Sequence, residues 1–265
     1  MAIGLRTVND QKAEAMKLNY MECWNGAMGL LKDHKEAVLA IAGVFLFLPS
    51  VLLAQFVGEP NVEGLVDAEA IQAANLTFFA ENWLAYLLMF IVTAIGSLSI
   101  YRLLSPSFAG TVSNALTQAA ALAIFFIVAN ILIALLMFGG LFLFIVPGLY
   151  LIGRLAVVPM VIADENERNP AAALQKGWAI TKNNGWSTFF FLLIILMVGL
   201  VTLLVFGLVI GLVLTLFSGG TGWPLAENIL SNLLGTGFQI LLLANVASVY
   251  RQLTGKGSDV AEIFS

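Results

Sequence analysis

Arg154 has the strongest claim to chemistry in this sequence, because it places a cation inside a long apolar run. Its guanidinium stays protonated and offers five donors in a planar fork that suits a phosphate or a carboxylate. A cation near the centre of a membrane helix costs roughly 2.5–3.5 kcal/mol on insertion scales, so it is usually paired or reaches the interface. The sequence therefore predicts that Arg154 holds an anionic group. The alternative is a side chain that snorkels to the interface, helped by a bend at Pro159.

Uncharged polar residues accompany Arg154 in the other apolar runs. Counted inward from the ends of their runs, Thr93 and Gln239 lie at a depth similar to that of Arg154, with Asn130 and Asn245 on either side of that layer. Such side chains line a path for a transported molecule, or they hydrogen-bond the helices to one another. Glu227, at the very start of the last run, is the only Asp or Glu within the six runs, and the lack of a deeper acid argues against a pump coupled to protons or cations.

The remaining reactive residues do not assemble into a catalytic pattern. Asp164, Glu165 and Glu167 form a short acidic cluster, which we interpret as a hydrated loop. His34 stands among charged neighbours and Cys23 is the single cysteine, so neither a metal site nor a disulfide framework is expected. No Gly-x-Ser-x-Gly, Walker or HExxH motif occurs. The sequence therefore predicts a protein that is not an enzyme and needs no cofactor.

The elements that position these residues follow from the composition. The chain has 265 residues, of which 60% are hydrophobic and 11% are charged, and its mean hydropathy is +0.95. An ordinary soluble domain has about 25% charged residues, so this chain has too few polar side chains to cover a surface that faces water. The same numbers exclude intrinsic disorder.

Six apolar runs are long enough to cross a bilayer core about 30 Å thick as helices. We predict an all-α polytopic membrane bundle, with the fifth span as one long, tilted helix. The predicted spans are Ala37–Val57, Asn82–Leu104, Ala115–Met137, Leu141–Ala163, Ser187–Phe217 and Ala226–Tyr250.

The basic residues predict the orientation. The loops on one side, residues 58–81, 138–140 and 218–225, contain no Lys or Arg. By the positive-inside rule the other side, with both termini, is cytoplasmic. A seventh span would export Arg251 and Lys256, which counts against it. The basic residues on the predicted cytoplasmic side are Arg6, Lys12, Lys17, Lys32, Lys35, Arg102, Arg168, Lys176, Lys182, Arg251 and Lys256.

Two further stretches have the pattern of amphipathic helices that lie on the cytoplasmic surface of the membrane. The first is Asn9–Asp33, and the second is Pro170–Asn183 with Asn169 as its N-cap. The alternative is that they pack on the ends of the bundle. The chain then divides into a cytoplasmic helical segment (1–36), a transmembrane domain (37–252) and a cytoplasmic tail (253–265).

The second stretch adds candidates for lipid contact to Arg154. Leu174 and Trp178 fall on its apolar face, and Lys176 and Lys182 stand away from that face. We therefore predict that Lys176, Trp178 and Lys182, together with Arg154, contact lipid headgroups or another anion.

The second half of the chain resembles a known family. The segments that carry the resemblance are Val146-Pro147-Gly148 to Arg154, Val158-Pro159 to Glu165, Ala173 to Lys182, and Ala226 to Leu234 with Tyr250-Arg251. They are similar to the YciC-like family of bacterial inner-membrane proteins and to the membrane domain attached to some glycerophosphoryl diester phosphodiesterases. The resemblance implies a six-helix protein of the bacterial inner membrane with no established reaction. The phosphodiesterase activity is not carried over.

Together these patterns predict a non-enzymatic membrane protein that engages lipids, another membrane protein or a second copy of itself, and no nucleic acid. One alternative is a carrier or flippase for an anionic or amphipathic small molecule, which a polar cavity reaching Arg154 would favour. Another is an accessory subunit of a larger membrane complex, which a solid apolar bundle with a flat exposed face would favour.

Overall fold

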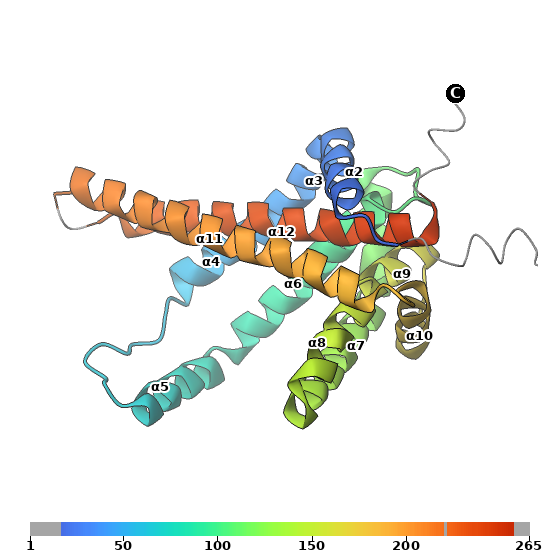
Figure 1. Cartoon of the computed structure of the whole chain (residues 1–265). Coiled ribbons are helices and arrows are strands. Elements are labelled where there is room, and N and C mark those ends of the chain that lie inside the picture. The colour runs from blue at the N-terminus through green and yellow to red at the C-terminus, as the bar shows by residue number, and fades with distance from the viewer. Residues whose placement is uncertain (1–16, 220–221, 257–265) are drawn as a thin grey trace, which may run out of the picture.

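The computed structural model describes residues 17–219 and 222–256, and every regular element in this part is helical (Figure 1). Six stretches are long and apolar enough to cross a membrane, which confirms the all-α polytopic bundle. The helices are α2 (Tyr20–Asp33), α3 (Lys35–Ala42), α4 (Leu48–Phe56), α5 (Ala68–Glu81), α6 (Trp83–Leu103), α7 (Val112–Leu143), α8 (Ile145–Leu155), α9 (Val158–Glu165), α10 (Pro170–Ile180), α11 (Gly185–Phe217) and α12 (Pro224–Thr254).

The first span joins α3 to α4 through a π-helical turn, Gly43–Phe47. Pro49 follows this turn directly and has no N–H to donate, and its ring would collide with a carbonyl in a regular α-helix. The wider π turn accommodates the proline without ending the span. The Ser50 hydroxyl donates to the Leu46 carbonyl at 2.6 Å and satisfies one backbone acceptor there.

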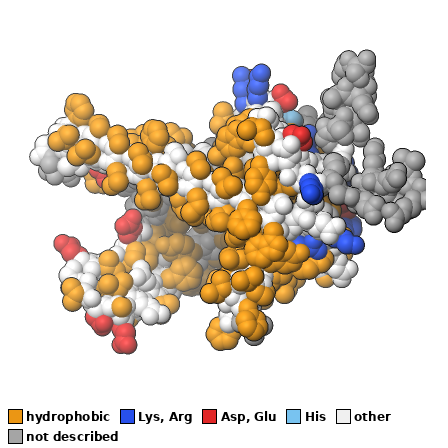
Figure 2. Space-filling view, viewed as in Figure 1, with side chains coloured by type: hydrophobic (Ala, Val, Ile, Leu, Met, Phe, Trp, Pro, Cys, Tyr) orange, Lys and Arg blue, Asp and Glu red, His pale blue; other side chains and the backbone are white. Residues whose placement is uncertain are grey.

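The helices converge at one end of the molecule and diverge at the other (Figure 1). We call the first end the basic end: it comprises the last turns of α6, α9 and α12 and the first turns of α7 and α11. The opposite end, with the 58–67 loop and α5, is the acidic end, and Figure 2 shows Asp and Glu side chains gathered there. At the basic end, α9 packs against α6, α7, α10 and α12, and its residues from Val158 to Ala163 include five with no exposed surface.

The turn between the third and fourth spans lies farther along the chain than predicted. Residues 138–140 continue α7, and only Phe144 leaves the helical conformation before α8 begins. The prediction of a loop at 138–140 was therefore wrong, because two glycines do not end a helix whose neighbours remain apolar. The close pairing of α7 with α8 depends on Gly148, where a Cβ atom would stand 2.6 Å from the Leu141 nitrogen.

The fourth span is interrupted, as its prolines suggested. Helix α8 ends at Leu155 and α9 begins at Val158, with Pro159 in its first turn, where a missing N–H breaks no hydrogen bond. The Met160 N–H donates to the Val157 carbonyl at 3.0 Å. This hydrogen bond spans three residues instead of the four of an α-helix, so α9 begins with a tighter turn.

The predicted 58–81 loop contains a helix that sequence analysis did not identify. Helix α5 is amphipathic only weakly, so no clear apolar stripe marks it, yet it is rich in Ala, Glu and Gln, which favour helix formation. It ends at Asn82, whose side chain donates to the Phe78 carbonyl at 2.9 Å, and Phe79 packs against Tyr86 of α6.

Candidate functional site

Arg154 lies in the last turn of α8, where this helix crosses the start of α11. Both helices carry a glycine at the crossing: a Cβ atom on Gly185 would be 2.6 Å from Cδ of Arg154, and one on Gly153 would be 2.9 Å from the Phe189 nitrogen. Arg154 is therefore level with the first residue of α11, at the basic end. The sequence placed it near the middle of the bilayer because the count assumed one continuous fourth span.

The contacts of the guanidinium come from α8 and α10. Nη1 of Arg154 donates to the Thr181 carbonyl at 2.7 Å, and the Thr181 hydroxyl donates to the Arg154 carbonyl at 2.8 Å. Thr181 follows the last turn of α10, where the helix dipole favours a cation. The guanidinium carbon lies 4.1 Å from the ring centroid of Trp178 and 5.7 Å from that of Tyr150, within the range of cation–π attraction.

Among the described residues, no carboxylate neutralises the charge of Arg154. The residue is 4% exposed, and no described carboxylate lies within ion-pair distance of it. Its Nε is buried and has no hydrogen-bond partner among the described residues. A buried cation without a counter-ion is costly, and the unused donors of the fork suit an oxyanion. Arg154 thus offers a positive charge and free hydrogen-bond donors to an anion.

Two of the predicted cations lie apart from Arg154. Lys176 forms ion pairs with Glu165 at 2.8 Å and Glu167 at 2.7 Å. These hydrogen bonds raise the pKa of Lys176, and the bond from Lys176 lowers the pKa of Glu167. Lys182 is exposed. Of the predicted lipid- or anion-binding residues, Trp178 is in cation–π contact with Arg154.

The uncharged polar residues do not form one layer with Arg154. Thr93 and Asn130 line a cavity between α6 and α7, and Gln239 of α12 donates to Ser97 of α6 at 3.4 Å. Asn245 has no exposed surface and donates to the carbonyl one turn earlier in α12.

Asp164 is the residue that sequence analysis misjudged most. It was assigned to a hydrated loop, but it is 4% exposed and accepts four hydrogen bonds. The donors are the Ser105 hydroxyl at 2.6 Å, the Ser107 backbone N–H at 3.1 Å, the Tyr250 hydroxyl at 2.8 Å and the Lys256 ammonium at 2.6 Å. These donors belong to the α6–α7 connection and to the end of α12 with the residues that follow it. The carboxylate therefore links α9 to both of these segments.

Two arginines extend this arrangement at the basic end. Arg102 donates to the carbonyls of Ala163 and Asp164 at 2.6 and 3.1 Å, and Arg251 donates to the carbonyl of Leu104 at 3.1 Å. Both therefore cap the last carbonyls of helices, where positive charge is favourable. Spacing in the sequence gave no signal for these contacts, because the partners are far apart in the chain.

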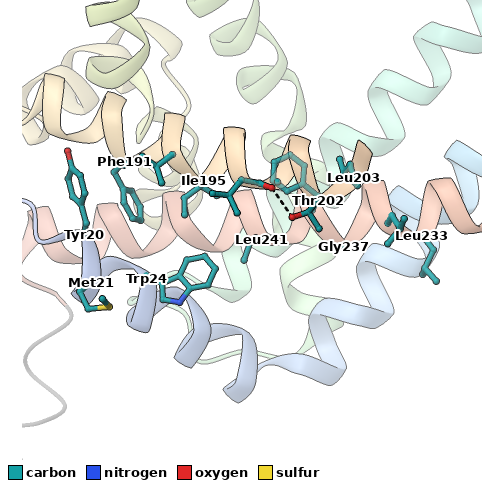
Figure 3. A pocket seen from close by; sticks show the side chains of 15 residues that line it. Tyr20, Met21, Trp24, Phe191, Ile195, Thr202, Leu203, Leu233, Gly237 and Leu241 are labelled. Atoms are coloured by element: carbon teal, nitrogen blue, oxygen red, sulfur yellow. Dashed lines mark hydrogen bonds between the residues drawn. The ribbon is translucent and has the colours of Figure 1, made fainter. Parts of the chain in front are cut away.

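An apolar groove of about 790 Å³ runs between α2, α11 and α12 (Figure 3). Tyr20 and Trp24 of α2 stand along one side, and Phe191 of α11 contacts the Tyr20 ring at a centroid distance of 5.4 Å. Thr202 adds a hydroxyl to the lining, but this group already donates to the Val198 carbonyl within its own helix. The groove has the size of small-ligand sites and an apolar lining suited to a hydrocarbon chain.

Helix α2 is the described part of the predicted Asn9–Asp33 segment, of which residues 9–16 lie outside the described residues. It begins after Asn19, whose side chain accepts from the N–H groups of Met21 and Glu22. It packs on α12 through Cys23 and Ala27, which have no exposed surface, whereas Met21 is 67% exposed. Burial raises the pKa of Cys23 to about 12, so this thiol stays protonated at neutral pH.

No protein-family model, curated protein or solved structure matches the chain. Its class therefore follows from its own helices: it is a multi-pass integral membrane protein. Within residues 17–219 and 222–256, no three His, Cys, Asp or Glu side chains are grouped closely enough to hold a metal ion.

Proposed function

We propose that this chain is a non-enzymatic protein of the bacterial inner membrane that binds the anionic headgroup of a membrane lipid at Arg154. The observation that carries the proposal is a buried guanidinium with no carboxylate partner among the described residues and an unpaired Nε. A phosphate oxygen would use the free donors of the fork and balance the charge.

Two features favour a lipid over a dissolved anion, and a third favours binding over carriage. Trp178 and Trp186 flank Arg154 and are 41% and 39% exposed, as expected for aromatic residues at the level of the headgroups. The apolar groove on another face of α11 is suited to an acyl chain (Figure 3). Arg154 lines neither this groove nor the α6–α7 cavity, so we favour binding over carriage.

The test compares the lipids that remain bound during gentle purification. Arg154→Gln keeps some hydrogen bonding but removes the charge, and Lys35→Gln, at an exposed cation outside the predicted lipid-binding residues, is the control. Charge-assisted hydrogen bonds are worth about 1.5–3 kcal/mol, so Arg154→Gln should lower retained anionic lipid roughly tenfold or more. Mass spectrometry of the extracted lipids measures this. If Arg154→Gln inserts normally and retains the parent's anionic lipids, the arginine is only a cap for α10.

We also propose that the basic end faces the cytoplasm. The proposal rests on the Lys and Arg residues of that side and on the absence of both from residues 58–81, 138–144 and 218–225, where the spans are joined at their other ends. Reporter fusions after Asp67 and after Ser265 should report opposite compartments. A result with both reporters in one compartment contradicts the six-span topology.

A further inference from the structure

The cavity between α6, α7, α9 and α12 holds an array of uncharged polar groups that the proposed lipid site does not use. Its volume is about 260 Å³, and its lining includes Thr93, Ser97 and Tyr101 on α6, one helical turn apart, and Asn130 on α7. These residues lie at i, i+4 and i+8 of α6 and therefore share one face of the helix. No charged residue lines the cavity.

Tyr101 is the observation that points to a ligand. The residue is 6% exposed and lines the cavity, and none of the side-chain hydrogen bonds among the described residues involves its hydroxyl. A hydroxyl on an otherwise buried side chain is stabilised by a hydrogen-bond partner, and the described protein does not supply one. The cavity that Tyr101 lines is the place where such a partner can bind.

The other groups define what this partner must offer. The Ser97 hydroxyl accepts from Gln239, and no described residue accepts its proton, so it can donate to a ligand. The Thr93 hydroxyl donates to the backbone of its own helix, which leaves its oxygen as an acceptor. Asn130 donates to the Phe126 carbonyl, which leaves its side-chain oxygen as a second acceptor. A ligand that both donates and accepts fits this set, and a charged ligand would have no counter-ion.

The apolar part of the lining limits the ligand further. Phe90, Phe126, Ile127 and Leu243 surround much of the cavity. Its volume equals about nine water volumes at roughly 30 Å³ each, and only the waters beside the four polar side chains would find hydrogen-bond partners on the protein. We infer that the α6–α7 cavity binds an uncharged alcohol, with the hydroxyl among Thr93, Ser97, Tyr101 and Asn130 and a compact hydrocarbon body against the apolar side chains.

The test uses the full chain in phosphatidylcholine nanodiscs and an octanol that carries a photoreactive diazirine. Mass spectrometry of the cross-linked peptides should place the label on α6 and α7, and excess octanol should remove it, whereas 1-chlorooctane, which lacks the hydroxyl, should not. Tyr101→Phe removes only one hydroxyl and should lower labelling about three- to tenfold, the worth of one neutral hydrogen bond. Tyr86→Phe, the same change on the same helix outside the cavity lining, should leave labelling unchanged.

Two competitors identify where the hydroxyl comes from. Competition by monoolein indicates a hydroxyl carried by a membrane lipid, and competition by butanol alone indicates a free small alcohol. Labelling that octanol does not displace, or that Tyr101→Phe and Tyr86→Phe change equally, would overturn the inference and leave a water-filled cavity. Because Arg154 does not line this cavity, failure here leaves the lipid-headgroup proposal standing.

Discussion

The basic and acidic ends of the molecule differ in the contacts that hold their helices together. At the basic end, polar side chains and charged groups bond one another around a buried helix, α9. Toward the other end, α11 presents Leu204, Leu208, Leu212 and Leu216 with 62–74% of each exposed. In a membrane there is no hydrophobic gain from packing leucines together, because lipid is as apolar as they are. Specific polar contacts therefore fix the basic end, and the exposed leucines of α11 leave an apolar surface suited to lipid.

The largest effect is expected at Asp164. Asp164→Asn removes the negative charge that pairs with Lys256 and receives three further hydrogen bonds, so we expect the free energy of unfolding to fall by roughly 2–4 kcal/mol. The exposed Asp67→Asn at the acidic end should change it by less than about 0.5 kcal/mol. Thermal unfolding in detergent measures both. Equal effects at the two ends would remove the basis of the comparison.

Two glycines of α11 provide a matched pair for packing. The Phe238 ring occupies the space that a Cβ atom on Gly199 would fill, whereas nothing lies near Gly207. Gly199→Ala should therefore destabilise the protein by about 1–3 kcal/mol, because α12 must move. Gly207→Ala should be neutral or stabilising by up to about 1 kcal/mol, since alanine favours the helix. Thermal unfolding in detergent measures both variants. A loss of stability in Gly207→Ala would show that this part of α11 packs against another part of the protein.

A smaller difference is expected along α10. Leu174 is half-buried and Gln175 is exposed, so a spin label at 174 should be less accessible than one at 175 to a water-soluble relaxation agent. Power-saturation electron paramagnetic resonance measures this accessibility. Equal values at the two positions would show that α10 does not rest on an apolar surface.

The smallest effect is the pH dependence of the exposed ion pairs at Lys176. Glu167 has a pKa below its ordinary value of 4.5, so its contribution to stability is present above that value and is lost as the pH falls through the lowered pKa. Lys176 has a pKa above its ordinary 10.5, so its contribution is complete below that value and is lost as the pH rises through the raised pKa. Melting curves of Lys176→Gln and parent should differ slightly between these values and merge outside them. A difference that persists at pH 2 would assign the effect to something other than these pairs.

Local signals in the sequence account for what could be predicted. Apolar length identifies the six spans, Pro159 marks the interruption of the fourth, and Asn169 with Pro170 marks the start of α10. The depth of Arg154 could not be counted, because counting along a span assumes a straight helix and this span breaks directly after that residue.

The surroundings of Asp164 were beyond sequence reasoning for a different reason. Its partners Ser105 and Tyr250 lie 59 and 86 residues away, and an acidic residue that follows an apolar run looks like an ordinary loop residue. The cavity at Tyr101 was likewise invisible, since a tyrosine near the end of a span is typical of the membrane interface.

The Asp164 contacts impose an order on biosynthesis. The carboxylate emerges from the ribosome with the fourth span, but Tyr250, Arg251 and Lys256, which bond it or cap the neighbouring helix, are made only with the sixth. Until then a nascent chain in the insertion machinery carries an acidic group that lacks these partners. The basic end can therefore close only after the sixth span is made, and in a chain truncated before Tyr250 the Asp164 carboxylate keeps its bonds from Ser105 and Ser107 but has no ammonium partner at Lys256.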